Sequence, residues 1–305
     1  MALTLDKKRI KNLLTKTVIF ILSFFIGMFL ARVTRAQDAK TLLWKIEGKE
    51  LKEPSYLYGT IHMICKDDFF FTKTMQSKLN ETEQTILELD MDDPQFMAKM
   101  QQGSLNNGMK NIASEFSEED KEVVDTFLKA NYGAGLAQLG IVKPFGLLSM
   151  VIQKSVTCEA QESYEQNFVK NAQEREVELL GLETVEFQTS LFDNVPIKDQ
   201  IKLLVTSIKE FEEGQEDFKK MVAAYKAQDL IKLKKLMDES PEYTQFEDLL
   251  INNRNTDWIA KIEKHAKEKP TFFAVGAMHL AGEQGVINLL KKEGYQLTPV
   301  ANSID

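Results

Sequence analysis

Two copies of a short pattern, Gly-x-x-His, lie near opposite ends of the 305-residue chain, at residues 59–62 and 276–279. Each follows an apolar run typical of a buried strand, and its glycine lets the backbone turn without a Cβ clash. The third histidine, His265, lies in a charged segment and shares none of this context. Imidazole is the commonest metal ligand and titrates near neutral pH. If both strands belong to one sheet, the two histidines predict a metal site or an acid–base pair.

Carboxylates end two further apolar runs. Glu88 and Asp90 lie on one face of a strand predicted at residues 85–90, since side chains two apart point the same way. Glu183 follows a strand predicted at residues 178–182. Such carboxylates must be hydrated, paired or metal-bound, because burying a bare charge is costly. The alternative is that they cap the helices that follow. We assign Glu88 to the site, and for Glu183 both interpretations stay open.

Arg254 and Asn255 precede Trp258, near the start of the helix that leads to the second Gly-x-x-His pattern. Arginine could pair with a substrate carboxylate or with the buried acids, and asparagine could orient a ligand or a water molecule. Spacing alone, however, predicts that Arg254 and Asn255 are surface residues.

The elements predicted around these residues form an α/β protein. Strands are predicted at residues 42–46, 56–58, 85–90, 178–182, 271–275 and 295–300, and helices at 69–82, 121–131, 163–175 and 282–292. The strand–helix–strand order after the first pattern predicts a parallel crossover. Residues 184–267 are almost entirely amphipathic and predict a helical insertion. The expected fold is a central mixed sheet from the N- and C-terminal parts with a largely helical middle, and the repeated strand and Gly-x-x-His pattern hints at an internal duplication.

The first 36 residues are typical of a signal peptide. Five basic residues precede a mostly apolar run at residues 17–31, and small residues at 34 and 36 offer a cleavage site before Gln37. The apolar run is shorter than the ~20 residues that span a bilayer. Arg32 and Arg35 are atypical of a cleaved signal, so an uncleaved N-terminal anchor is the alternative. Both interpretations predict an exported protein, either periplasmic, extracellular or membrane-anchored, with its domain at residues 37–305.

The charge of the chain argues against one class of partner. The formal net charge is −8, and residues 1–36 carry seven Lys and Arg and one Asp, so their removal would bring it to −14. Nucleic-acid binding requires clustered positive charge, and we therefore expect no nucleic-acid partner. The apolar content of 43% is enough for a substantial core in a domain of this size.

The two cysteines, Cys65 and Cys158, leave two main interpretations open. After export they would meet an oxidising compartment, where a disulfide can form. A pair of buried free thiols is the alternative. Cys65 also lies three residues after His62, which is compatible with a metal thiolate, but a thiolate would be prone to oxidation in that compartment.

Five motifs in a fixed order carry a family resemblance. They are Tyr58-Gly59-Thr60-Ile61-His62, Leu87-Glu88-Leu89-Asp90, Gly181-Leu182-Glu183-Thr184 with Gln188, Arg254-Asn255 with Trp258, and Val275-Gly276-Ala277-Met278-His279-Leu280 with Gly282 and Gly285. Together they resemble the TraB/PrgY/GumN family, which is related to the Tiki membrane-anchored proteases. Each motif alone is weakly specific, but the resemblance covers nearly all of the expected domain, roughly residues 42–300.

The resemblance implies a metal-dependent hydrolase of peptide or amide bonds that uses a divalent ion, manganese or cobalt. The implied site consists of the metal ligands His62, Glu88 and His279 and, beside Glu88, the catalytic residues Glu183, Arg254 and Asn255. Two histidines and a carboxylate suit zinc or iron equally well. In this interpretation Glu183 or a second acid accepts a proton, and Arg254 stabilises the developing oxyanion.

Two other functions are compatible with the same residues. The wider resemblance extends to erythromycin esterases and haem-binding lipoproteins, so the family does not fix the chemistry. One alternative is a metal-free, esterase-like hydrolase in which His62 is a general base oriented by Glu88. The other is an exported module that binds a peptide or small molecule without turnover. Unlike the Tiki proteins with their large anchored ectodomains, this chain would contact a membrane only through its N-terminal segment.

Overall fold

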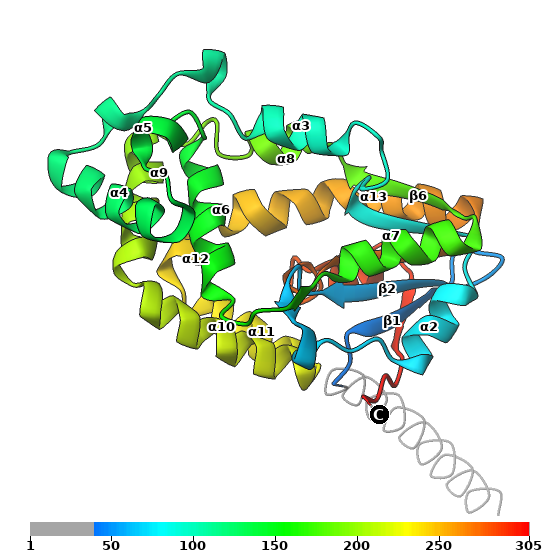
Figure 1. Ribbon diagram of the computed structural model, residues 1–305. Helices are drawn as coiled ribbons and strands as arrows, with labels where there is room; N and C mark the ends of the chain where they lie inside the picture. Colours follow the sequence, from blue (N-terminus) through cyan, green and yellow to red (C-terminus); the bar gives the residue numbers. More distant parts are fainter. Residues whose placement is uncertain (1–39, 305) are drawn as a thin grey trace, which may run out of the picture. The chain divides into compact units, whose positions relative to one another are not determined.

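The computed structural model describes residues 40–304, which contain a six-stranded mixed sheet (Figure 1). The strand order is β6-β4-β7-β2-β1-β8. The strands are β1 (Leu43–Glu47), β2 (Ser55–Thr60), β4 (Gln84–Leu89), β6 (Glu178–Glu183), β7 (Thr271–Gly276) and β8 (Gln296–Pro299). The predicted α/β fold with a central mixed sheet is therefore confirmed.

The four strands that carry the candidate residues run parallel. β7 pairs in parallel with β2 on one side and with β4 on the other, and β4 pairs in parallel with β6. The carboxyl ends of these strands therefore meet at one edge of the sheet, where open α/β sheets bind their ligands. In the register between β2 and β7, Thr60 lies opposite Gly276. The two Gly-x-x-His patterns thus leave the sheet side by side.

Helices cover both faces of the sheet, which explains why every residue of β2 and β7 is buried. One face packs against α2 (Lys73–Asn80) and α7 (Tyr164–Arg175), and the other against α13 (Asn253–Glu268) and α14 (Val286–Lys292). Successive side chains of a strand point to opposite faces of the sheet. Tyr56 and Tyr58 of β2 therefore belong to the core on the first face, and Leu57 belongs to the core on the second.

The remaining helices form the helical part of the molecule. They are α3 (Phe96–Gly103), α4 (Glu118–Tyr132), α5 (Leu136–Leu139), α6 (Pro144–Ser155), α8 (Val185–Ser190), α9 (Ile197–Lys209), α10 (Phe211–Lys226), α11 (Leu230–Asp238) and α12 (Pro241–Glu247). Val124, Leu147 and Leu204 join α4, α6 and α9 in a third apolar cluster. Tyr225 of α10 and Leu233 of α11 belong instead to the first core of the sheet. In Figure 1 the β2 arrow points toward this helical part, so it lies on the side of the carboxyl ends of the parallel strands.

Two differences from the predicted elements concern the residues after the Gly-x-x-His patterns. The predicted helix at 69–82 begins only at Lys73, because the Thr72 side chain caps it by accepting from Met75 N. The strands that follow the two patterns also differ: β4 runs parallel to β2, whereas β8 pairs antiparallel with β1 at the sheet edge. The two patterns therefore have unlike surroundings despite their similar sequence.

The predicted signal peptide or anchor at residues 1–36 lies outside the described residues. Among the helices of residues 40–304, none combines the length and the apolar character that crossing a bilayer requires.

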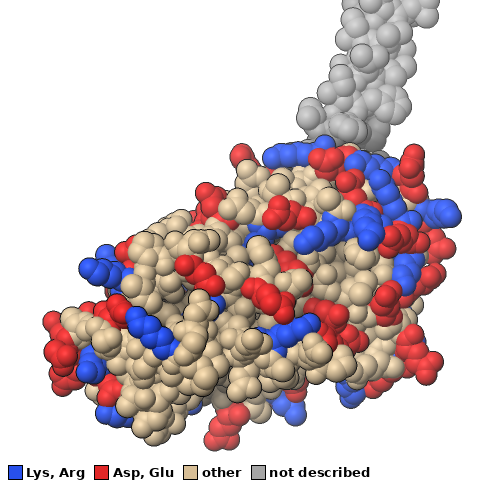
Figure 2. All heavy atoms as spheres, turned by 90° about the horizontal axis from the view of Figure 1, so that it is seen from above, with Lys and Arg blue, Asp and Glu red and all other residues tan. Residues whose placement is uncertain are grey.

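Charged side chains are interspersed over the face shown in Figure 2, with Lys and Arg beside Asp and Glu. Several pairs lie one turn apart on a helix, such as Lys219–Glu216 and Lys220–Asp217 on α10. Exposed pairs of this kind contribute little to stability, and we attribute them to the solvated surface.

A disulfide joins Cys65 to Cys158. Cys65 ends the short strand β3 (Ile64–Cys65), which pairs antiparallel with β5 (Gln161–Glu162). The sequence left open whether the two cysteines form a disulfide or remain free thiols, and the structure contains the disulfide. Cys65 is therefore not a metal ligand. The bridge ties the residues that follow the first Gly-x-x-His pattern to the segment that leads into α7.

Candidate functional site

A buried arginine lies between two glutamates at the carboxyl ends of β4 and β6. Arg254 Nη2 donates to Glu88 Oε2 at 2.6 Å and to Glu183 Oε2 at 2.8 Å, and its Nε donates to Glu183 Oε1 at 3.0 Å. The side chains of Arg254, Glu88 and Glu183 are only 8%, 12% and 3% exposed. With both carboxylates ionised, the three groups together carry one uncompensated negative charge.

Gln188 and Trp258 complete the hydrogen bonds of the two glutamates. Gln188 Nε2 donates to Glu88 Oε2 at 3.2 Å and to Glu183 Oε2 at 2.9 Å, and Trp258 Nε1 donates to Glu183 Oε1 at 2.8 Å. The guanidinium of Arg254 also lies 5.0 Å from the centroid of a Trp258 ring, a favourable cation–π distance. Both oxygens of Glu183 therefore accept hydrogen bonds from protein donors.

His279 is buried, and its partners determine its tautomer. Asn255 Nδ2 donates to two backbone carbonyls, so Asn255 Oδ1 is the atom that faces His279 Nδ1 at 2.6 Å. Nδ1 therefore carries the proton and Nε2 presents its lone pair. Arg254 Nη1 donates to this Nε2 at 3.3 Å, and Glu88 Oε1 lies 3.8 Å from it. The His279 ring packs on Trp258 with 4.3 Å between ring centroids.

His62 lies at the open side of the cluster, with its side chain 69% exposed. Its Nδ1 is 3.2 Å from Glu165 Oε1, which also accepts a hydrogen bond from Thr60 Oγ1 at 2.7 Å. An ionised carboxylate only accepts hydrogen bonds, so His62 Nδ1 is the donor. The other ring nitrogen, Nε2, is then available to a ligand.

The space that a side chain at position 276 would fill is bordered by the three predicted metal ligands. A Cβ on Gly276 would lie 3.3 Å from Glu88 Oε1, 3.5 Å from His279 Cδ2 and 3.6 Å from His62 Nε2. Gly276 N also donates to Glu88 Oε1 at 2.8 Å. The two imidazoles and the carboxylate, which come from distant parts of the chain, therefore converge on one small space.

Local backbone structure directs two of these side chains. Arg254 follows a π-helical turn, η4 (Asp248–Asn252), of a kind often found at functional sites. Its Nη1 donates to Leu250 O within that turn at 2.8 Å, which anchors the guanidinium. Gln188 lies on α8, which begins where the Thr184 side chain accepts a hydrogen bond from Phe187 N.

The interpretation of Arg254 and Asn255 from spacing alone, as surface residues, is wrong, since they are 7% and 0% exposed. Their burial beside Glu88 and His279 agrees with the place in the site that the family resemblance implied. Both lie on the face of α13 that carries Trp258 and Ile262 into the core, as helical spacing of three to four residues allows. The charge of Arg254 is tolerated in this position because two carboxylates offset it.

The neighbours of the two histidines give them different charges. Burial lowers the pKa of His279 to about 3, against the opposing charge of Glu88, so this imidazole is neutral at pH 7. Desolvation also opposes protonation of His62, but the charge and hydrogen bond of Glu165 raise its pKa to about 9. Although desolvation opposes ionisation of Glu88, the positive charges around it and the Gly276 N–H hold its pKa well below its usual range.

The donor chemistry of the site fits a divalent metal ion. Metal-bound histidines typically donate their second ring N–H to a carboxylate or carbonyl oxygen, as His62 does to Glu165 and His279 does to Asn255. Glu88 adds an ionised oxygen at the same space. Within residues 40–304, however, no group of three or more His, Cys, Asp or Glu side chains is arranged to hold an ion, and the guanidinium of Arg254 lies at His279 Nε2.

The structure brings five of the six predicted site residues into one buried cluster: Glu88, Glu183, Arg254, Asn255 and His279. It places the sixth, His62, at the edge of the same cluster. Glu165 lies near the start of the helix predicted at residues 163–175 and was not among the predicted site residues. Its position in the first turn of α7 is typical of an acid that favours the helix N-terminus. The pairing of Cys65 with Cys158 is the signal that could have located Glu165 near His62.

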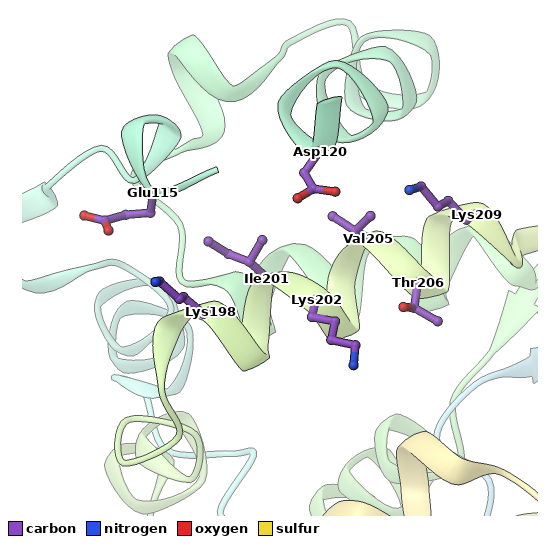
Figure 3. Close-up of a pocket in the computed structure, with 8 residues that line it drawn as sticks. All are labelled: Glu115, Asp120, Lys198, Ile201, Lys202, Val205, Thr206 and Lys209. Atoms are coloured by element: carbon purple, nitrogen blue, oxygen red, sulfur yellow. The ribbon is translucent and has the colours of Figure 1, made fainter. Parts of the chain in front are cut away.

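The cavity drawn in Figure 3 is separate from this cluster. Its volume is about 380 Å³, and it lies between α9, α4 and the turn at Glu115. Lys198, Lys202 and Lys209 line it from α9. None of the six predicted site residues borders it, so it contributes nothing to the site.

Comparison with known proteins identifies the family. The model of the TraB/PrgY/gumN family matches residues 42–299. This chain belongs to the TraB/PrgY/gumN family. No significant match was found among curated proteins or solved structures. The matched range includes both Gly-x-x-His patterns and all six predicted site residues, so the resemblance seen in the motifs is confirmed. Membership identifies the domain, and the chemistry has to be argued from the site.

Replacing Arg254 with methionine should destabilise this family member by about 3–5 kcal/mol, because Glu88 and Glu183 would stay buried without their charge partner. Urea unfolding followed by circular dichroism measures the difference. The double variant R254M/E183Q should recover part of the loss, since one of the two uncompensated carboxylates is gone. Wild-type stability in R254M would show that the ion pairs do not hold the cluster together.

Proposed function

We propose that this protein is an exported, metal-dependent hydrolase of peptide or amide bonds, with His62, Glu88 and His279 as its metal ligands. The observation that carries the proposal is the convergence of these three side chains on the space beside Gly276. The uncompensated negative charge of the glutamate–arginine cluster favours a cation there as well. The donor set of two imidazoles and a carboxylate suits manganese, cobalt, iron or zinc.

A divalent ion at this position would supply Lewis acidity, which polarises a carbonyl group and makes water a stronger acid. The residues of the chain prepare the site for it. Asn255 and Glu165 each fix a ring N–H, so that His279 and His62 both present Nε2. Arg254 and Gln188 bind Glu88 Oε2, which leaves Oε1 toward the space beside Gly276.

The contacts of Glu183 favour a different role from that of the proton acceptor in the mechanism expected from the sequence. Its two oxygens are occupied by Arg254, Gln188 and Trp258. We therefore assign Glu183 the task of holding Arg254 in place. Arg254 in turn fixes the direction of Glu88. Its Nη1 donates a hydrogen bond to His279 Nε2.

One observation favours a second candidate, a metal-free hydrolase. The hydrogen bond from Arg254 Nη1 occupies the lone pair of His279 Nε2 that a metal would need. In this candidate His62, oriented by Glu165, would be the general base on an ester-like substrate, and its raised pKa would confine that activity to alkaline pH, where the ring has lost a proton. Full hydrolytic activity after exhaustive chelation would favour it over the metal-dependent enzyme.

Replacing His62 or His279 with alanine should reduce bound metal to well below one ion per chain and lower peptide turnover by at least ~100-fold, because each removes one of three protein ligands. Elemental analysis and a peptidase assay on the purified protein give the two values. H265A is the matched control, since His265 lies on α13 outside the cluster. Unchanged metal content and turnover in both variants would end the proposal.

Substituting Gly276 with alanine tests the small space directly. The backbone at Gly276 has a negative φ that alanine adopts readily, and the added Cβ would lie 3.3–3.6 Å from its neighbours, so the fold should be retained. The methyl group would nevertheless occupy the space between the ligands, and metal binding and turnover should both be lost. G214A is the control, because a Cβ there meets nothing within 4 Å. A fully active G276A would show that no ligand occupies this space.

Export is the part of the proposal that the disulfide supports, because such bonds persist mainly in oxidising compartments. Producing cells can be lysed in denaturant with a thiol-alkylating reagent, and the labelled cysteines then counted by mass spectrometry. The full chain should remain unlabelled at Cys65 and Cys158. A variant without residues 2–36, retained in the cytoplasm, should be labelled at both. Labelling of the full chain to the same extent would contradict export.

A further inference from the structure

We propose that Glu165 is a positioning residue that orients the His62 imidazole, and that the Cys65–Cys158 bridge holds Glu165 in place. The proposal rests on the proposed function, since it concerns how one of the ligands of that site is prepared. Glu165 belongs to none of the motifs that define the site in the sequence.

The two histidines of the site are held in different ways. His279 is 4% exposed and lies against Trp258, so packing and Asn255 together restrain its ring. His62 is mostly exposed, and a ring with so little packing turns freely unless a hydrogen bond restrains it. The hydrogen bond that restrains it is the one between its Nδ1 and Glu165 Oε1.

The carboxylate of Glu165 is itself well fixed. Thr60 Oγ1 donates to Oε1 at 2.7 Å, and Ser163 Oγ donates to Oε2 at 3.0 Å. Its side chain is only 12% exposed. Thr60 ends β2, two residues before His62, so the same acid bonds to both the strand end and the histidine. A fixed acceptor at Nδ1 directs His62 Nε2 to the space beside Gly276, where Nε2 lies 3.6 Å from the position of a Cβ.

The disulfide joins the segments that carry the two partners. Cys65 follows His62 by three residues, and Cys158 precedes Glu165 by seven. Between them, Ile64 pairs with Glu162 in the short ribbon of β3 and β5, and Lys66 N donates to Ala160 O at 3.0 Å. Buried Tyr164, at the start of α7, packs against Tyr58 and Phe69. A two-stranded ribbon is marginally stable by itself, so the covalent bond reinforces the connection between this start and the first Gly-x-x-His pattern.

The experiment uses the full chain with ¹⁵N-labelled histidine, without metal, and follows the imidazole N–H resonances. A hydrogen-bonded Nδ1–H of His62 should give a slowly exchanging resonance that disappears in H62A. E165A should lose this resonance and bind Mn²⁺ about 10–100-fold more weakly, as loss of a carboxylate behind a metal-bound histidine typically does. E165Q retains an acceptor oxygen and should recover much of both. E174A is the control, because Glu174 is an exposed acid on the same helix.

Each outcome decides one part of the proposal. If E165A keeps the resonance and the wild-type Mn²⁺ affinity, Glu165 does not position His62. Should E165A fail to fold, the same two measurements on E165M, which fills a similar volume but offers no acceptor oxygen, take its place. Retention of resonance and affinity in C65S/C158S would overturn the role of the bridge. A wild-type protein without hydrolytic activity would refute the proposed function but leave the resonance to decide on Glu165.

Discussion

Arg254 carries a permanent positive charge into a nearly water-free environment, between two carboxylates, an imidazole and an indole. The hydrogen bonds of Glu183 and the charge of Glu88 raise its pKa although desolvation opposes this, so the guanidinium stays charged. A buried ion cluster adds little net stability, but the rigid fork of a guanidinium fixes the direction of both acids. Glu88 consequently has Oε2 bound to Arg254, while Oε1, which accepts a hydrogen bond from Gly276 N, lies at the candidate site. The ion pairs of Arg254 thus join α13 to the ends of β4 and β6.

The sheet supplies the second constraint. Because β2 and β7 are adjacent and parallel, two strand ends from opposite parts of the sequence emerge together. Their surroundings then make two similar histidines unlike each other. His279 packs against α13 and is neutral, whereas His62 lies at the surface beside Glu165, an acid that raises its pKa. A site built in this way has one fixed, buried ligand and one exposed ligand whose orientation depends on a single carboxylate.

Strand ends could be recognised in the sequence because apolar runs, glycine and a following polar residue are local signals. For this reason Glu88, Glu183, His62 and His279 could all be selected as candidates, and the mixed α/β fold was predicted correctly. From spacing alone, Arg254 and Asn255 were interpreted as surface residues. Arg254 can be buried only because Glu88 and Glu183 offset its charge, and these acids lie far away in the sequence. Glu165 was not recognised, because its contact with His62 spans 103 positions.

The sequence by itself determined the chemical inventory: two equivalent histidines, acids at strand ends, a cysteine pair and a family whose motifs run through the whole domain. These features are local, and residue type and spacing are enough to reveal them. Only the tertiary structure decided which of them meet. The order of the strands placed β7 between β2 and β4, and the packing of α7 on the sheet brought Glu165 to His62. The physical reason is that strand pairing and buried charge pairing are non-local interactions, whose partners are selected by the packing of the entire domain.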